Sequence, residues 1–266
     1  MIKIKKIATL DEIVELIKEQ KYDNSLDRYR SSYLYRGMPN SSFELITGLQ
    51  RYCKLKKSSI EKPMLRNFTK YAMLDDPRLN ESVWRKLIIG QHHGLPTRLL
   101  DWTYSPLVGL HFATSGEDLT SMDQHDCVLW KLDIEELNSL LPEKYKSKLE
   151  QESAYFFTTD MLDTICKDLI EYDKDMQGNS MVVFEPPSID QRIISQYSYF
   201  LIVPNMINNL EKFFNANTSH TVKYIIDKNL RWRVRDLLDQ MNINERIIYP
   251  GLDGLTAWLK RHYYVK

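Results

Sequence analysis

The chain has 266 residues, of which 43% are hydrophobic and 27% charged, and its 36 Lys and Arg balance its 36 Asp and Glu at a net charge of zero. This composition is typical of a globular protein that buries a core in one domain or two small ones, so intrinsic disorder is excluded. The zero balance also removes the argument for wholesale attraction to nucleic acid or to an anionic membrane, but it leaves room for a small basic pocket.

The three cysteines, Cys53, Cys127 and Cys166, are widely spaced and odd in number. They match neither a disulfide framework nor the closely spaced pairs of a zinc site. The first six residues are basic, but no apolar region or cleavage site follows them, and no stretch is apolar enough to span a membrane. We therefore expect a soluble cytoplasmic protein with no membrane partner.

The first half of the chain is predicted to be mainly helical. Thr9 and Glu12 have the pattern of a capping box at the start of an amphipathic helix that runs to Gln20. Further helices are predicted at 60–74, 81–89 and 105–113. The last of these is apolar almost all round, so we expect it to be buried.

The second half contains most of the predicted strands. Strand composition occurs at 33–35, 128–133, 181–185, 200–203 and 222–227. Helical stretches at 134–141 and 208–214 lie between them, and two amphipathic helices separated by Pro250-Gly251 close the chain. This order predicts a single α+β domain over 1–266, in which a helical N-terminal half packs on a small, mainly antiparallel sheet.

The densest polar cluster is the segment 91–103, Gln-His-His-Gly-Leu-Pro-Thr-Arg-Leu-Leu-Asp-Trp-Thr. We predict a loop that presents binding or reactive groups, anchored by the buried helix after it. A structural alternative stays open, in which Arg98 pairs with Asp101 and His92 or His93 bonds a carbonyl group. No metal is expected, because adjacent histidines in a strand point to opposite sides and no H-x-x-x-H or C-x-x-C spacing occurs.

Two shorter segments also carry polar groups beside a strand. Arg36-Gly37 follows the strand composition at 33–35 and would place a fixed cation at the sheet edge beside accessible N–H groups, which suits phosphate or an amide ligand. The run 190–200 contains Arg192 and Gln196 and enters another strand. Taken alone, an arginine at the end of a strand is usually a solvated or paired surface residue, and the run 190–200 could be a structural turn with Arg192 in a salt bridge.

Nucleic-acid and nucleophile motifs are weak or missing in the sequence. There is no nucleophile elbow, P-loop or dinucleotide-binding glycine motif. Basic and aromatic residues alternate at 231–235, but Arg231 and Arg235 share one face of an amphipathic helix, and a solvated face is favoured. We therefore predict no strong nucleic-acid signal.

Together the three polar segments resemble the FRG domain, a bacterial and phage domain named after a Phe-Arg-Gly signature. The residues that carry the resemblance are Tyr35-Arg36-Gly37, the segment 91–103 with Pro106 and Phe112-Ala113, and Arg192 with Gln196 and Phe200. The closing run 249–255 is similar to the usual ending of that family. The resemblance extends from about residue 25 to residue 262 and leaves the first helix, in 1–24, outside it.

The motif order of this family is similar to that of the ADP-ribosyltransferase fold, which implies NAD as a substrate. In that fold an arginine followed by glycine holds NAD, the place of Arg36 and Gly37 here. The segment 101–103 stands where that fold has a Ser-Thr-Ser strand, and Gln191 or Gln196 falls near the catalytic glutamate. A glutamine lacks the charge that stabilises an oxocarbenium-like ribose, so either Asp101 or Asp190 supplies it or the pocket binds without this chemistry.

The leading hypothesis is ADP-ribosyl transfer or NAD cleavage in a cleft formed by Arg36, the segment 91–103 and the segment 192–196. The candidate catalytic residues are His92, His93, Asp101 and Gln196. The candidate cofactor-binding residues are Arg36, Gly37, Thr97, Arg98, Thr103 and Arg192.

Two alternatives stay open. The same cleft could belong to a non-catalytic module that binds a phosphorylated or nucleotide ligand, or to a hydrolase or nuclease that uses His93 and Asp101. In each case three arginines in the motif segments favour a compact anionic ligand over a long polyanion. The acceptor macromolecule is not indicated.

Overall fold

The computed structural model describes residues 1–116 and 118–266. Its centre is a seven-stranded mixed sheet of order β1-β9-β6-β4-β5-β8-β7, in which β1 and β9 are parallel and the other neighbours antiparallel. The strands are β1 (Lys3–Ile7), β4 (Tyr33–Met38), β5 (Leu99–Thr103), β6 (Cys127–Asp133), β7 (Val182–Phe184), β8 (Ser198–Ile202) and β9 (Val222–Ile226). The predicted α+β class with a mainly antiparallel sheet is confirmed.

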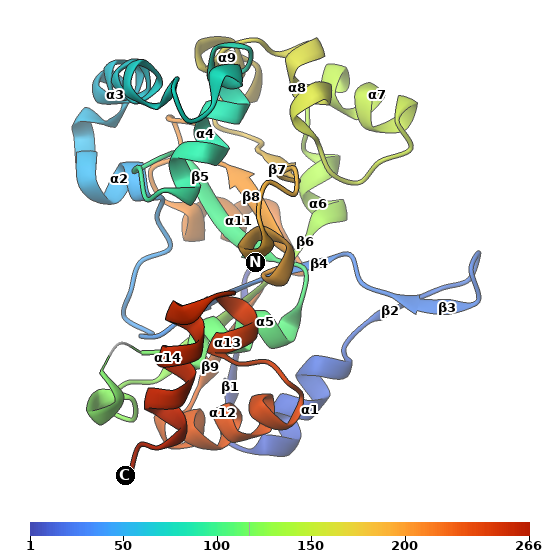
Figure 1. Cartoon of the computed structure of the whole chain (residues 1–266). Helices are drawn as coiled ribbons and strands as arrows, with labels where there is room; N and C mark the ends of the chain where they lie inside the picture. Colours follow the sequence, from blue (N-terminus) through green and yellow to red (C-terminus); the bar gives the residue numbers. More distant parts are fainter. Residues whose placement is uncertain (117) are drawn as a thin grey trace.

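Helices cover the sheet and both of its ends. They are α1 (Leu10–Lys18), α2 (Gly48–Cys53), α3 (Lys57–Ala72), α4 (Val83–His92), α5 (Pro106–Thr114), α6 (Ile134–Ser139), α7 (Glu143–Gln151), α8 (Thr159–Ile165), α9 (Leu169–Met176), α10 (Gln191–Ser195), α11 (Leu210–Asn217), α12 (Arg231–Gln240), α13 (Glu245–Ile248) and α14 (Leu252–His262). Figure 1 shows α3, α4, α8 and α9 at one end of the sheet and α12, α13 and α14 at the other. Among the described residues, no helix has the length and apolar character needed to cross a membrane.

The core has three apolar clusters, and each joins a different set of helices to the sheet. One contains Trp102 and Trp130 of the sheet with Phe214 of α11. A second joins α4 and α7–α9 to β7 and β8, and the third packs α1, α5 and α12 on β1, β4, β6 and β9. The burial of large apolar side chains on both faces explains why the strands have few exposed positions.

The capping box predicted at the N-terminus is confirmed. Thr9 Oγ1 accepts a hydrogen bond from the Glu12 N–H at 3.3 Å, and Glu12 Oε2 accepts one from the Thr9 N–H at 2.9 Å. Ile13 and Leu16 of α1 are buried in the third cluster. The helix therefore begins where its side chains satisfy the first free N–H groups.

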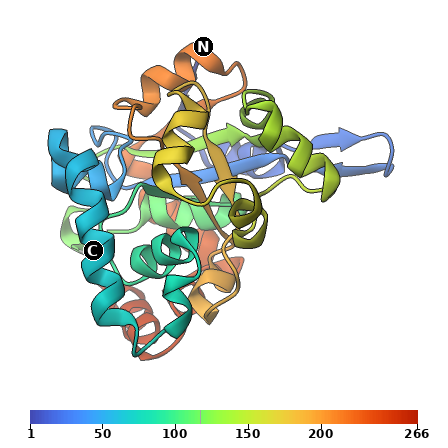
Figure 2. The ribbon, with the colours of Figure 1, turned by 90° about the horizontal axis from the view of Figure 1, so that it is seen from above.

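The sheet also contains strands that the composition did not indicate. The segment 91–103 is not one loop, because α4 extends to His92, the chain turns at Gly94 with φ +82°, and 99–103 form β5. Helices α7–α9 occupy the polar middle, so the helices are not confined to the first half. A hairpin of β2 (Lys21–Asp23) and β3 (Arg28–Arg30) projects from the body in both views (Figures 1 and 2).

The position of β4 corrects the expectation that Arg36 lies at a sheet edge. Strand β4 lies in the middle of the sheet, between β6 and β5. It pairs with β6 over six residues but with β5 only at Tyr35 and Thr103. The sheet therefore opens between β4 and β5 beside Arg36.

Candidate functional site

The three motif segments meet at one cavity of about 320 Å³ where β4 and β5 separate. Its walls are formed by Tyr35, Arg36 and Gly37, by Gln91, Asp101, Trp102 and Thr103, by Phe112, and by Arg192, Gln196 and Ser198. Strand β4, the end of α4 with β5, and the short helix α10 bring these segments together, and the lining residues Tyr35 and Ser198 are 163 positions apart in the sequence. The volume is at the lower end of the ~300–1,000 Å³ typical of small-molecule sites.

Arg36 occupies the opening between the two strands. Its Nη1 donates to the main-chain carbonyl of Asp101 at 2.6 Å and lies 3.7 Å from Asp101 Oδ2. Burial lowers the pKa of Arg36, the charge of Arg51 lowers it further, and Asp101 opposes both. Among the described residues, Arg36 Nε and Trp102 Nε1 are buried donors without a hydrogen-bond partner. The site therefore offers a partly buried cation with a buried, unused donor, which suits an anionic ligand.

The carboxylate of Asp101 is held by a chain of polar side chains. Thr97 Oγ1 donates to Gln91 Oε1 at 2.7 Å, and Gln91 Nε2 donates to Asp101 Oδ2 at 2.9 Å. The side chain of Asp101 is 55% exposed, so the oriented carboxylate faces the open cavity. Such a group can stabilise positive charge that develops on a ligand or accept a proton from a hydroxyl group.

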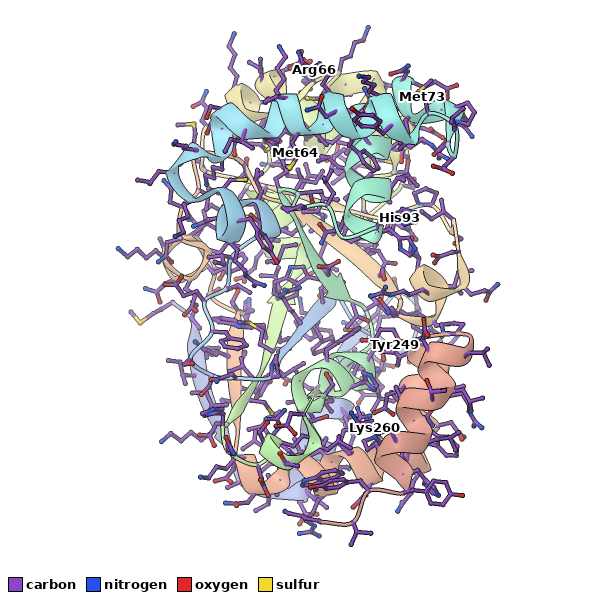
Figure 3. All side chains as sticks on the ribbon, turned by 60° about the vertical axis from the view of Figure 1, so that its left-hand side comes forward. Met64, Arg66, Met73, His93, Tyr249 and Lys260 are labelled. Atoms are coloured by element: carbon purple, nitrogen blue, oxygen red, sulfur yellow. The ribbon has the colours of Figure 1, made fainter. Side chains whose placement is uncertain are left out.

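The opposite wall is anchored to the C-terminal helices. Gln196 Nε2 donates to the carbonyl of Ile248 at 3.2 Å, and the main-chain carbonyl of Gln196 accepts from Thr103 Oγ1 at 2.7 Å. The guanidinium of Arg192 lies 5.3 Å from the ring centre of Tyr249, a cation–π arrangement that keeps its charge at the rim. Figure 3 shows Tyr249 and His93 on the same side of the molecule.

Several residues of the site were missed by sequence reasoning. Gln91 orients Asp101, Phe112 and Ser198 line the cavity, and Tyr249 supports Arg192. Tyr249 is 57 residues beyond Arg192, and only its place in the closing Tyr-Pro-Gly run was a signal. The sequence of an isolated segment does not show which distant ring a guanidinium will contact.

The predicted catalytic roles of His92 and His93 receive no support from their positions. Neither residue lines the cavity, and His93 is exposed. His92 Nε2 contacts the carboxylate of Asp190, which caps α10, so this histidine ties α4 to α10. Burial lowers the pKa of His92, and the nearby His93 and Arg192 lower it further against the effect of Asp190. Among the described residues, His93 and Asp101 share no hydrogen bond or ion pair, and only Asp101 of the two lines the cavity.

Arg98, a predicted ligand-binding residue, does not line this cavity. Its side chain is 2% exposed, and it donates from Nε to Glu61 Oε1 at 2.7 Å and from Nη1 to Asp173 Oδ1 at 2.8 Å. It thus joins β5 to α3 and α9, and it does not pair with Asp101. Thr97 is buried as well, and it contributes to the site through its hydrogen bond to Gln91.

The predicted solvated face of Arg231 and Arg235 is also wrong, because both side chains are buried. Arg235 Nη1 donates to His111 Nδ1 at 2.8 Å, and its Nη2 pairs with Glu245. Glu245 also accepts from Arg261 Nε at 2.7 Å. This charged network fixes α12, α13 and α14 to α5 and thereby positions Ile248 and Tyr249, which contact the lining residues Gln196 and Arg192.

The buried His111 makes stability depend on pH. Burial, with the charges of Arg235 and Arg261, holds the pKa of His111 well below its ordinary 6.5, and the Arg235 donor requires a neutral ring. Below about pH 6.5 the unfolded chain therefore binds a proton that the folded chain does not. The free energy of unfolding should fall by up to about 1.4 kcal/mol per pH unit as the pH drops from 6.5 towards 5. Urea denaturation at several pH values measures this slope.

His111→Asn, which keeps an acceptor for Arg235, should flatten that slope, whereas the exposed His262→Gln should not. Equal slopes for His111→Asn and the wild type would show that His111 does not carry the effect.

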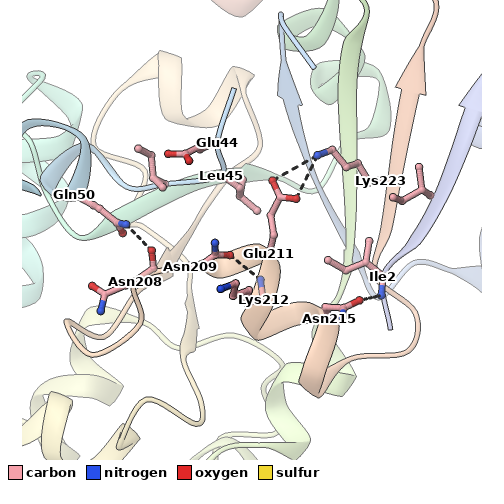
Figure 4. Close-up of a pocket in the computed structure, with 12 residues that line it drawn as sticks. Ile2, Glu44, Leu45, Gln50, Asn208, Asn209, Glu211, Lys212, Asn215 and Lys223 are labelled. Carbon is pink, nitrogen blue, oxygen red and sulfur yellow. Dashed lines mark hydrogen bonds and ion pairs between the residues drawn. The ribbon is translucent and has the colours of Figure 1, made fainter. Parts of the chain in front are cut away.

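Two other polar sites in the structure are already satisfied. A hollow of about 510 Å³ contains Gln50, whose Nε2 donates to the carbonyl of Asn208 at 2.6 Å, and Glu211, which pairs with Lys223 at 3.3 Å (Figure 4). Cys166, Glu171 and Asp175 bring possible metal ligands together, but Lys144 Nζ bonds both carboxylates at 2.9 and 3.0 Å. Neither site contains a residue of the three motif segments.

The fold and this cavity define an α+β protein with an arginine-lined cavity in an opened sheet. Residues 31–121 match the family model of the FRG domain, so the chain carries an FRG domain, as its motifs indicated. A search of curated proteins and a search of solved structures each found no match. The segment 190–200 and the closing run 249–255 lie outside the matched residues, although they form one wall of the cavity.

Proposed function

We propose that the protein cleaves NAD at the bond between nicotinamide and ribose and transfers ADP-ribose to an acceptor or to water. The observation that carries the proposal is the meeting of Asp101 with two arginines, Arg36 and Arg192, in one cavity. Two cations suit a diphosphate, and a single carboxylate suits the ribose that becomes positively charged. A cavity of about 320 Å³ has room for one half of a dinucleotide.

In the proposed reaction the C1′–N bond breaks and its electron pair leaves with neutral nicotinamide. Asp101 stabilises the oxocarbenium-like ribose through its charge, and its carboxylate is oriented by the hydrogen bond from Gln91 and the ion pair with Arg36. The oxygen or nitrogen nucleophile then bonds to C1′ and releases its proton to solvent or to Asp101. Gln196 cannot supply the charge, because its amide is neutral and already donates to Ile248.

Asp101→Asn tests this chemistry directly. The substitution keeps the size of the side chain but removes the charge, so nicotinamide release from NAD should fall about 10²–10³-fold while NAD binding persists. Chromatography of the reaction measures nicotinamide, and the thermal shift produced by NAD measures binding. The exposed Asp236→Asn serves as the matched control and should keep full activity. The chemistry is wrong if the wild-type protein leaves NAD intact with protein and nucleic-acid acceptors present.

A second candidate is a non-catalytic module for a phosphorylated or nucleotide ligand. It is favoured by the contacts of Asp101, whose carboxylate is already shared between Gln91 and Arg36. In this case a nucleotide would raise the melting temperature without turnover, and Arg36→Gln would remove the shift.

We also propose that the protein acts in the cytoplasm. Cys53, Cys127 and Cys166 are all unpaired, and two of them are buried. Free thiols fit a reducing compartment.

A further inference from the structure

The zero net charge conceals a strongly basic surface on α2 and α3. Between Gly48 and Ala72 the sequence has seven Lys or Arg and one acid, Glu61. Glu61 is buried against Arg98, and Lys57 is buried with its Nζ on the carbonyl of Ile207 at 3.0 Å. The remaining six cations are exposed, and the described part of the chain offers none of them an ion pair: Arg51, Lys54, Lys56, Lys62, Arg66 and Lys70.

Three of these cations form a regular row on α3. Lys62, Arg66 and Lys70 are spaced by four residues, so they follow one another along one side of the helix at steps of about 6 Å. Like charges at this spacing repel one another and destabilise a helix. A chain of phosphates lying along the row would remove the repulsion.

An apolar groove of about 700 Å³ runs beside the row. Its lining is mainly apolar, with Met64, Phe68 and Tyr71 of α3 and Leu95, and it also includes Asn67 and Asp75. The ring of Tyr71 is 72% exposed, and Lys70 Nζ lies 5.0 Å from its centre. Figure 3 shows Arg66 on the outward side of α3 and Met64 on the side nearer to α4. Cations and an exposed aromatic groove therefore lie side by side on one helix.

We propose that this surface binds single-stranded nucleic acid, with phosphates on the row 62, 66 and 70 and unstacked bases in the groove against Tyr71. Single-strand binding sites combine a basic track with aromatic stacking in this way. A duplex would leave the groove unused, because its bases are already stacked. The proposal does not depend on NAD chemistry in the cavity.

A membrane surface fits the same residues less well. A helix that lies on a membrane needs an exposed apolar face. The apolar face of α3 at Leu65 is instead buried against α4 and its neighbours, and the apolar groups that stay exposed, in the groove at Tyr71, share that groove with Asn67 and Asp75.

The test is fluorescence polarisation of a labelled single-stranded oligonucleotide with the full chain. The triple variant Lys62→Gln, Arg66→Gln and Lys70→Gln should bind the oligonucleotide about tenfold or more weakly at low salt. A plot of the logarithm of its binding constant against the logarithm of the salt concentration should have a slope shallower by about 2, because each of the three lost phosphate contacts contributes about 0.7. Tyr71→Ala should weaken binding about fivefold or more. The matched control removes three exposed cations at the opposite end of the molecule, with Lys228→Gln, Arg233→Gln and Lys260→Gln (Figures 1 and 3), and should bind like the wild type.

The proposal is overturned if the wild-type chain does not bind the oligonucleotide, or if the α3 triple variant binds as tightly as the control triple variant. It is also overturned if the chain binds vesicles containing phosphatidylserine but no oligonucleotide, or if a duplex binds as well as the single strand and Tyr71→Ala has no effect. Circular dichroism of each variant checks that α3 is intact. Nicotinamide release measured on the same preparations separates this result from the outcome for the cavity.

Discussion

Arg98→Met is expected to lower the free energy of unfolding by about 3–5 kcal/mol, because it leaves two buried or half-buried carboxylates without their cation. Arg98 holds Glu61 from α3 and Asp173 from α9 against β5. Asn205 also donates to both carboxylates, at 3.1 and 3.0 Å, but supplies no charge. Urea denaturation at neutral pH measures the loss.

The contrast with Arg192 makes this prediction specific. Arg192 is exposed at the rim of the cavity, so Arg192→Gln should change stability by less than about 0.5 kcal/mol while it weakens binding of an anionic ligand. If Arg98→Met kept the stability of the wild type but lost ligand binding, Arg98 would bind the ligand directly, and its structural role between α3 and α9 would be contradicted.

Gly37→Ala should destabilise the protein by more than about 3 kcal/mol, because there is no space for a side chain between β4 and α5. A Cβ at this position would lie 2.1 Å from the carbonyl oxygen of Gly109 and 2.2 Å from the nitrogen of Ala113. Both are backbone atoms, so the whole helix would have to move away from the strand. The movement would also displace Arg36 and Phe112, which line the cavity.

Gly48→Ala is the matched control, since its Cβ would make an ordinary contact of 3.4 Å with Pro96. Melting temperature and soluble yield compare the two variants. A Gly37→Ala protein as stable as Gly48→Ala would mean that the glycine is needed for ligand approach and not for packing of α5 on β4.

Much of the local structure was predictable from neighbouring residues. The capping box at Thr9, the buried helix after Ser105-Pro106 and five of the strands were all found, since each depends on residues only a few positions apart. Strands β1 and β5 were missed for a physical reason. Four of the five residues of β1 are exposed at the sheet edge, and β5 is buried on both faces except at Asp101, so neither shows the alternation typical of a half-buried strand.

The sequence predicted which segments form the candidate site, but not what each side chain in those segments does. The motifs at 35–37, 91–103 and 192–196 could be selected from residue type, spacing and family resemblance, and they do line one cavity. The direction of each side chain depends on partners far along the chain. Arg98 turns away from the cavity because it pairs with Glu61 and Asp173. These partners are 37 and 75 residues away in the sequence, so the segment around Arg98 does not reveal them.

For the charged residues, too, the sequence determines one property and the tertiary structure decides another. Composition alone establishes a net charge of zero and no more than that. The fold buries Arg98, Arg231 and Arg235, although they resemble surface cations in the sequence. It leaves Lys62, Arg66 and Lys70 in a row without an ion pair to any residue that the structure describes. Electrostatic energy depends on the distance between charges and on their exposure to water, and only the tertiary structure sets these two quantities.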